Sequence, residues 1–243
     1  MGQLTQTVLT HDRIRIAFDW YAHASRTAII VCPGFFQSKQ ARSFQRMSQA
    51  FTDRYDVVCM DFRGHGRSGG WYTFSSRESA DLEAVLEWMQ ERYTAVGLIG
   101  FSMAGAIAIA TLSQRRWPVV RSLISVSAPS TFDRIEFKWW HPQAIWTGCQ
   151  ALGPGTGCRP GSPFLPKPRP LDLVAQLPVP TLFVHGTRDP IVGHQHSKRL
   201  FDAAREPKRL AIIDRGRHAE FLFRDDPQRF MQLVNGWWDQ TLQ

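Results

Sequence analysis

The sequence predicts an α/β fold with a mostly parallel central sheet and helices on both of its faces. Short segments rich in β-branched residues alternate with longer segments of helical periodicity, and this alternation is typical of strand–helix–strand units. Two of the strand segments, Thr27–Cys32 and Ala95–Phe101, are apolar throughout instead of alternating with polar residues. Such strands are expected where a parallel sheet is covered on both faces.

The predicted strands follow from their β-branched and apolar composition. In chain order they span 13–20, Thr27–Cys32, Asp56–Met60, Ala95–Phe101, 119–126, 180–184 and Lys208–Ile213. Right-handed crossovers are expected to join those strands that are parallel.

Predicted helices lie between these strands, over 76–92, the AIAIATL segment 106–112, 194–205 and 225–240. In the first of them the apolar residues recur at the spacing of one buried helix face; these residues are Leu82, Val85, Leu86 and Met89. Ser76 stands where an N-cap is expected, and Glu78 follows in the predicted first turn.

One segment, 129–178, interrupts the alternation. It contains three of the nine tryptophans, a glycine-rich stretch, GPGTGC, and a proline-rich stretch, PGSPFLPKPRP. It is too long for an ordinary loop and too aromatic for a disordered segment. We therefore predict an ordered cap, or lid, inserted into a single domain that spans residues 1–243.

The composition is that of a globular protein with a basic surface. The 29 Lys and Arg residues outnumber the 21 Asp and Glu residues and give a net charge of +8. The basic residues are scattered along the chain, whereas a nucleic-acid-binding protein usually concentrates them on one face. Binding to nucleic acid is therefore the weaker hypothesis, and it predicts salt-sensitive retention on DNA.

Targeting signals and membrane spans are not predicted. The N-terminal residues lack the apolar stretch of a signal peptide, and no apolar run approaches the length that crosses a bilayer. We expect a cytoplasmic protein without a membrane partner.

The four cysteines do not form a recognised metal-binding pattern. Cys32 and Cys59 lie in apolar strands and are expected to be buried free thiols. Cys149 and Cys158 enclose the glycine-rich stretch, so a disulfide and two free thiols are both possible, and a reducing cytosol favours free thiols. His194 and His196 also make a poor metal pair, because residues two apart on a helix point away from each other. No metal and no cofactor are predicted.

The strongest chemical signal is LIGFSMAG, residues 98–105. An apolar strand ends there and a helix-forming segment begins directly after Ser102. A serine on such a sharp strand-to-helix turn needs small residues two positions before and after it, which here are Gly100 and Ala104. The helix start also directs N–H groups toward the site, where they favour a developing oxyanion.

Three further segments follow predicted strands and supply matching groups. In VCPGFF, residues 31–36, the turn at Pro33 and Gly34 is placed to present the N–H of Phe35 beside Ser102, and the N–H of Met103 would be the second oxyanion donor.

Asp189 in VHGTRDPIV and His218 in RGRHAEF each come just after a predicted strand. Because open α/β sheets gather their sites at the carboxyl ends of the strands, Asp189 and His218 are expected to meet Ser102 there. Asp214 is a rival acid whose place just before the histidine loop fits less well.

With these motifs, the sequence resembles the α/β-hydrolase family over nearly its whole length. DFRGHGRS, residues 61–68, is similar to the segment that many members carry after their fourth strand. We interpret its aspartate and glycines as a structural turn, and His65 as non-catalytic because it precedes the serine. Many members have His-Gly where this sequence has Pro33-Gly34.

The resemblance implies Ser102 as nucleophile, His218 as base and Asp189 as acid, with an oxyanion hole from the N–H groups of Phe35 and Met103. It also implies a cap between the sixth and seventh strands, which corresponds to segment 129–178. The residues expected to line the substrate pocket are aromatic: Phe36, Trp71, Trp139, Trp140 and Trp146. Tyr72 and Phe74 are further candidates for this lining.

These residues predict a serine hydrolase of the carboxylesterase type that cleaves short- to medium-chain esters through an acyl-enzyme. Thioesters, lactones, amides, peptides and the C–C bonds of diketones are alternative substrates of the same residues. A slow-turnover ligand-binding protein on a hydrolase scaffold is a further alternative. The expected partner is a small-molecule ester, with no nucleic acid, and the protein is expected to be a monomer or homodimer.

Overall fold

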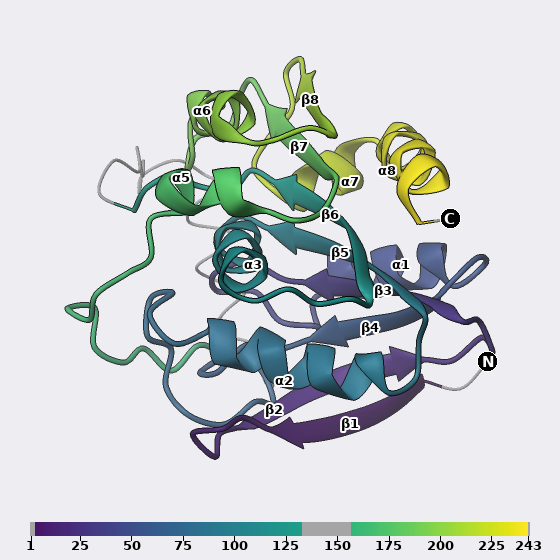
Figure 1. Cartoon of the computed structure of the whole chain (residues 1–243), viewed down its shortest axis with the longest axis vertical. Helices are drawn as coiled ribbons and strands as arrows, with labels where there is room; N and C mark the ends of the chain where they lie inside the picture. The colour runs from purple at the N-terminus through teal and green to yellow at the C-terminus, as the bar shows by residue number, and fades with distance from the viewer. Residues whose placement is uncertain (1–2, 133–156, 243) are drawn as a thin grey trace.

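The strands form one sheet in the order β1-β2-β4-β3-β5-β6-β7-β8 in the computed structural model, which describes residues 3–132 and 157–242 (Figure 1). Their bounds are β1 Gln3–Leu9, β2 Arg15–Tyr21, β3 Thr27–Cys32, β4 Asp56–Met60, β5 Ala95–Phe101, β6 Val120–Val126, β7 Thr181–Gly186 and β8 Lys208–Ile213. β2 is antiparallel to both β1 and β4, and the pairs from β4 to β8 are parallel. The predicted mostly parallel sheet is confirmed.

Helices cover both faces of this sheet (Figure 1). They are α1 Arg42–Phe51, α2 Ser79–Gln90, α3 Met103–Gln114, α5 Pro170–Leu173, α6 Gln195–Ala203, α7 Phe221–Asp225 and α8 Pro227–Thr241, with a short 3-10 helix η1 at Val174–Gln176. The side chains of β3 show the double cover, because Ile30 packs with residues of α2 and α3 whereas Ile29 and Val31 pack with residues of α1 and α8. Successive strand residues point to opposite faces, so an all-apolar strand needs exactly such a two-sided core.

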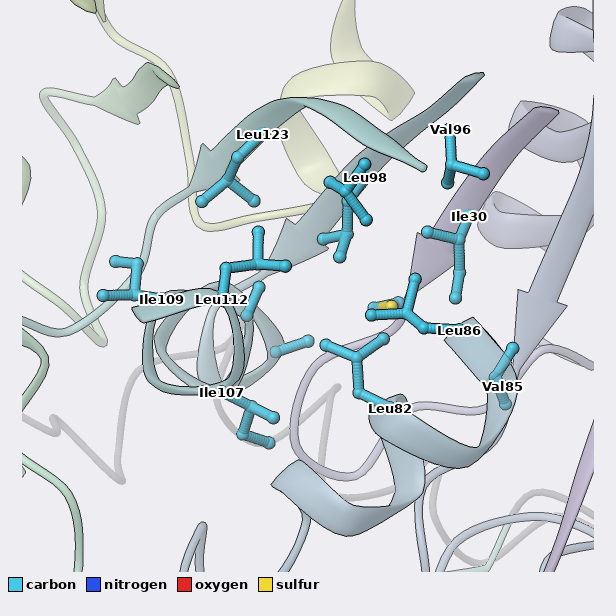
Figure 2. Close-up of a cluster of buried hydrophobic side chains, with 14 of the residues drawn as sticks. Ile30, Leu82, Val85, Leu86, Val96, Leu98, Ile107, Ile109, Leu112 and Leu123 are labelled. Atoms are coloured by element: carbon cyan, nitrogen blue, oxygen red, sulfur yellow. The ribbon is translucent and has the colours of Figure 1, made fainter. Parts of the chain in front are cut away.

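The core on the α2 and α3 side contains the helix face predicted from the sequence. Leu82, Val85, Leu86 and Met89 are fully buried. Figure 2 shows the first three in one cluster with side chains of the sheet and of α3. The α3 helix is buried from Met103 to Leu112, as expected for a helix that has the sheet on one side and other helices around it.

The strand order places a topological switch point between β3 and β5. The chain leaves β3 toward β4 on one side, and β5 then returns to pair with the other side of β3. The loops that follow β3 and β5 therefore part in opposite directions and leave a crevice at the carboxyl edge of the sheet, which is where ligands bind in open α/β sheets.

β1 and α1 were not predicted, nor were the short helices α5, η1 and α7, and α2 begins later than expected. β1 is an edge strand with mostly polar, exposed residues, and α1 has only a few apolar residues, Phe44, Met47 and Phe51, on its buried face. Ser76 does not cap α2, because its hydroxyl donates to Pro166 O at 2.7 Å. The carboxylate of Glu78 accepts instead from the N–H of Thr73 at 2.6 Å, which delays the helix to Ser79.

The segment predicted as a cap falls between β6 and β7. Its residues 133–156 lie outside the described residues, and with them lie Trp139, Trp140, Trp146 and Cys149. Residues 157–161 lie against the turn after β4: the N–H of Gly66 donates to Gly157 O at 3.0 Å and that of Tyr72 to Arg159 O at 2.9 Å. Cys158, like Cys32 and Cys59, is a free thiol.

Candidate active site

Ser102 stands at the junction where β5 ends and α3 begins. Its backbone has φ 52° and ψ −119°, a left-handed conformation that a residue with a side chain adopts only where the surroundings impose it. A Cβ at Gly100 would lie 2.7 Å from Ala104 O and 2.8 Å from Gly105 N. Glycine at position 100 therefore lets the strand and the helix approach closely enough to turn sharply at Ser102.

The start of α3 supplies unpaired N–H groups next to Ser102. The carbonyl of Ser102 accepts the N–H of Gly105 at 3.0 Å, which opens the helix. The first N–H groups of a helix have no acceptor within the helix, and they carry the positive end of its dipole. The N–H of Met103 belongs to this first turn.

The loop after β3 lies directly against Ser102. A Cβ at Gly34 would stand 3.0 Å from Phe101 O and 3.2 Å from the Cβ of Ser102. Glycine at this position is therefore what allows the two loops to touch. Phe36 has a positive φ of 60°, and the ring of Phe35 stacks on that of Phe36, with 3.7 Å between centroids.

The turn after β4 holds the loop after β3 in place. Asp61 accepts the N–H of Lys39 on Oδ1 at 2.7 Å and the N–H of Arg67 on Oδ2 at 2.9 Å. A Cβ at Gly66 would come within 2.3 Å of the Asp61 carboxylate, so glycine is required for this contact. These contacts fit the interpretation of DFRGHGRS as a structural turn.

His65, in the same turn, is buried and faces the aromatic residues of the site. Its Nδ1 lies 3.1 Å from Arg63 O, and its ring meets the Tyr72 ring edge to face at 4.9 Å. Burial lowers the pKa of His65 to about 4. His65 does not line the cavity that contains Ser102.

A buried ion pair anchors the same loop from the other side. Lys39 Nζ lies 2.6 Å from Asp19 Oδ1, and both side chains are fully buried. Asp19 also accepts hydrogen bonds from Gln3 Nε2 at 2.9 Å and Thr5 Oγ1 at 2.8 Å, both on β1. A buried charge needs such partners, so the position of Lys39 is fixed by the edge of the sheet.

Asp189 and His218 meet at the carboxyl edge of the sheet, as the sequence predicts. His218 Nδ1 lies 2.6 Å from Asp189 Oδ2. Asp189 follows β7 and His218 follows β8, and these two strands are parallel neighbours. The short contact assigns the proton of the imidazole to Nδ1, because a carboxylate oxygen is an acceptor.

The Asp189 carboxylate is fully occupied by four donors. Oδ1 accepts the N–H groups of Ile191 and Val192, each at 2.9 Å. Oδ2 lies 3.1 Å from His185 Nε2 in addition to His218. His185 Nε2 also lies 2.8 Å from Val192 O, and since both of its partners are acceptors this nitrogen carries the proton.

These contacts shift the two ionisable groups in opposite directions. Burial alone would raise the pKa of Asp189, but the charge of His218 and the hydrogen bonds from His185 and His218 outweigh it and hold that pKa well below its usual range. Burial would lower the pKa of His218, but the charges of Asp189 and Glu220 outweigh it and raise that pKa. Asp189 is therefore ionised at neutral pH.

A cavity of about 310 Å³ joins these elements. Its wall contains Ser102, His218, and the residues of both predicted oxyanion donors, Phe35 and Met103. The remaining lining is mostly aromatic and aliphatic: Phe36, Tyr72, Phe74, Pro129, Phe132, Ile191 and Val192. The site therefore combines an apolar pocket with a few convergent polar groups.

Of the residues predicted to line the pocket, Phe36 does so and Trp71 does not. Trp71 is 63% exposed and is absent from the described lining. Neighbouring residues of an extended segment point in opposite directions, and here Tyr72 is the one that turns inward. Trp139, Trp140 and Trp146 lie outside the described residues.

Two residues near the site were missed by the sequence analysis. His185 lies four residues before Asp189 and directly contacts its carboxylate. Glu220 lies two residues after His218 and lines the cavity. A search for further titratable residues within a few positions of each predicted site residue would have found both.

The described part of the chain offers neither a metal-binding cluster nor a membrane-spanning helix. Between residues 3–132 and 157–242, no group of three or more His, Cys, Asp or Glu side chains is arranged to hold a metal ion. His196 is buried, and its Nδ1 accepts the N–H of Ser130 at 3.0 Å. Among the helices of these ranges, none has the length and apolar character needed to cross a bilayer.

Comparison with known proteins identifies a family and relatives. The model of the family described as "Alpha/beta hydrolase family" matches residues 29–233. The uncharacterized protein YqkD of Bacillus subtilis is 25% identical over 232 residues, which cover 88% of this chain and 73% of that protein. The uncharacterized protein YfhR of Escherichia coli O157:H7 is 25% identical over 171 residues, which cover 68% of this chain and 54% of YfhR. The chain thus spans about half the length of this second relative.

Solved structures share the fold. An esterase of Pyrococcus furiosus superposes with a TM-score of 0.82 at 21% identity, and the match covers 100% of this chain and 92% of the esterase. At this level of identity the likeness concerns the fold.

Proposed function

The chain belongs to the alpha/beta hydrolase family, and from this membership we propose that it is a serine hydrolase that cleaves carboxylic esters of short to medium chain. The observation that carries the proposal is the 2.6 Å contact between His218 Nδ1 and Asp189 Oδ2 at a cavity whose wall also contains Ser102. A nucleophile, a base and an oriented carboxylate around one pocket form the set that acyl transfer needs.

In the proposed reaction Ser102 Oγ attacks the ester carbonyl while His218 Nε2 takes the proton of the hydroxyl. Asp189 keeps the His218 proton on Nδ1, so that Nε2 carries the lone pair and acts as the base. The resulting imidazolium is stabilised by the ionised carboxylate. His218 then returns the proton to the leaving alcohol, and the acyl group stays on Ser102.

Water then hydrolyses the acyl-enzyme by the same proton transfers. His218 takes a proton from water, the hydroxide oxygen bonds to the acyl carbon, and the bond to Ser102 Oγ breaks with return of the proton to Oγ. The oxyanion of each tetrahedral intermediate would be held by the N–H groups of Phe35 and Met103. The contact of Gly34 with Ser102 and the position of Met103 in the first turn of α3 support these assignments. Loss of one such donor typically lowers the rate by about 100- to 1,000-fold.

The size and lining of the cavity support an ester with a small apolar acyl or alcohol part. A volume of about 310 Å³ lies at the lower end for small-molecule sites. The esterase named among the structural neighbours has the same fold. A cytoplasmic location, and a cap over residues 129–178 within one domain, complete the proposal from the sequence.

The nucleophile is tested by Ser102→Ala together with a covalent label. We expect Ser102→Ala to abolish hydrolysis of nitrophenyl butyrate without changing the thermal unfolding temperature by more than a few degrees. A fluorophosphonate should add one label to the wild-type protein at Ser102, located by peptide mass spectrometry. Full turnover by Ser102→Ala, or inactivation with the label on another residue, would contradict the assignment. A panel of esters, thioesters, lactones, amides and diketones with the same acyl chain then ranks the substrates.

A further inference from the structure

Glu220 is a buried acid in the wall of the cavity that contains Ser102 and His218. It is 3% exposed and stands between His218 and the first residue of α7. It also lies close enough to His218 for the two charges to interact. The proposed ester hydrolysis assigns it no task.

One oxygen of this carboxyl group has no partner among residues 3–132 and 157–242. Within the described part of the chain, Glu220 Oε1 is buried and makes no hydrogen bond. A buried acceptor without a donor costs free energy, and the cost is greater for a group that carries charge. By contrast, each oxygen of the nearby Asp189 carboxylate has two donors.

The other lining residues explain why this oxygen is suited to a substrate. Most of the wall is aromatic or aliphatic and offers no hydrogen bond. Lys167 also lines the cavity, but its Nζ donates to Pro163 O at 2.5 Å within its own loop. Gln37 is a further polar residue of the lining. Glu220 is thus a lining residue whose Oε1 accepts from no described donor, and a substrate hydroxyl at this wall would supply one.

We propose that Glu220 is a specificity-determining residue that accepts a hydrogen bond from a hydroxyl group of the substrate, so that the pocket prefers hydroxylated esters. The inference rests on the proposed function for the reaction, and it adds the chemistry of the substrate. A site that offers a buried hydrogen-bonding group discriminates strongly against an analogue that leaves the group unpaired.

The charges around the cavity favour a hydroxyl group over an ammonium group. Lys167 carries a positive charge in the wall, and His218 becomes positive during each proton transfer. A substrate ammonium would add a third positive charge in a largely apolar pocket, where Asp189 already pairs with His218 and Glu220 is the one carboxylate of the described lining. A hydroxyl satisfies Oε1 without the cost of burying another charge.

The test compares matched pairs of nitrophenyl esters that differ by a hydroxyl in place of a methyl group. One pair is β-hydroxybutyrate and β-methylbutyrate, and the other is ω-hydroxyhexanoate and heptanoate, with ω-aminohexanoate as the ammonium analogue. The readout is the ratio of kcat/KM within each pair, for the wild type, Glu220→Leu and Glu220→Gln. Glu91→Leu, which removes an acid whose side chain is 72% exposed, is the control for net charge.

We expect the wild type to prefer the hydroxyl member of at least one pair by about tenfold, the effect of one hydrogen bond to a buried group. Glu220→Leu should lose or reverse this preference, Glu220→Gln should keep part of it because an amide oxygen also accepts, and Glu91→Leu should match the wild type. Equal ratios in the wild type and Glu220→Leu would overturn the proposal, and so would a wild-type preference for the ammonium analogue. If Glu220 had a purely structural role, Glu220→Leu would lower kcat/KM for both members of a pair alike. That result would also count against the proposal.

A binding measurement separates this inference from the proposed reaction. Methyl ketones with the same chains cannot be hydrolysed, and calorimetry gives their dissociation constants for the same variants. A hydroxyl preference in ketone binding that Glu220→Leu abolishes would support the role of Glu220 even if Ser102→Ala showed that the reaction is wrongly assigned. Equal binding of both ketones by the wild type, with normal turnover, would reject the role of Glu220 and leave the reaction standing.

Discussion

Replacing Asp189 with asparagine tests the proposed mechanism most directly. The carboxylate receives two N–H groups on Oδ1 and two histidine nitrogens on Oδ2. An asparagine keeps one oxygen, and that oxygen retains the backbone donors of Ile191 and Val192 if the amide nitrogen takes the place of Oδ2. The amide N–H then points at His218 Nδ1. To accept this hydrogen bond, Nδ1 must be unprotonated, so the imidazole proton moves to Nε2.

This change of tautomer is what lowers the rate. With the proton on Nε2, His218 has no lone pair to take the proton of Ser102. The corresponding substitution in a serine protease lowers kcat by about 10,000-fold, or about 5 kcal/mol of transition-state stabilisation, and we expect a loss of similar size here.

The folded state should lose much less than the transition state. His185 Nε2 loses its contact with position 189 but keeps Val192 O at 2.8 Å, while the second amide N–H, which faces His185, is left without an acceptor. The loss is that of one hydrogen bond to a charged group with one buried donor left unsatisfied, roughly 1.5–3 kcal/mol. Catalysis and stability are thus expected to fall by clearly different amounts.

The assay pairs steady-state hydrolysis of nitrophenyl butyrate with urea unfolding of the same preparations. Asp214→Asn is the matched control, because Asp214 is the rival acid in sequence and its side chain is 83% exposed; its kcat should stay within twofold of the wild type. A kcat for Asp189→Asn within tenfold of the wild type would refute the mechanism, and so would an equal loss in Asp214→Asn.

Three further predictions concern the base, the turn and the loop after β3. Because the pKa of His218 is raised above 6.5 and the base acts in its neutral form, kcat/KM should increase with pH and reach half its maximum above pH 6.5; a midpoint below that value would contradict the shift. Gly100→Ala should destabilise the protein by about 1–3 kcal/mol in urea unfolding and lower kcat, since its Cβ would meet the Ala104 backbone at 2.7 Å. Gly236→Ala, with nothing within 4 Å in the interior of α8, should instead stabilise by about 0.5–1 kcal/mol, and equal effects of the two alanines would be inconsistent with this account. Lys39→Met leaves the Asp19 charge buried without its cation and should lower the unfolding free energy by about 3–5 kcal/mol in urea unfolding. A loss below about 1 kcal/mol would contradict this prediction.

The sequence predicts the central strands well because they are buried on both sides. β3, β4 and β5 occur at the expected bounds, and their largely apolar runs leave little choice of structure. β8 also occurs at the expected bounds, although it is an edge strand and only partly buried. β1 was not predicted because an edge strand is held by its neighbour and needs no apolar pattern of its own. α1 was not predicted because three apolar residues on one helix face are a weak signal among many polar residues.

At the candidate site, the local motifs and the meeting of Asp189 with His218 at one sheet edge were predictable, whereas contacts that depend on exact distances were not. The strained turn at Ser102 follows from the glycine and alanine around it, because that constraint acts over four residues. The contact of His185 with Asp189, and the unpaired oxygen of Glu220, depend on how separate strand ends meet. Nothing in the pattern of single residues records such distances.

The hydrogen bonds from β1 to Asp19 give the edge of the sheet an influence over chemistry at its centre. Gln3 and Thr5 set the environment of a carboxylate that pairs with Lys39, and Lys39 lies only a few residues after Phe35. An affinity tag or a short truncation that loosens the beginning of β1 would therefore alter the loop that carries a proposed oxyanion donor. Activities of differently trimmed preparations of this protein should be compared only when both retain Gln3 and Thr5.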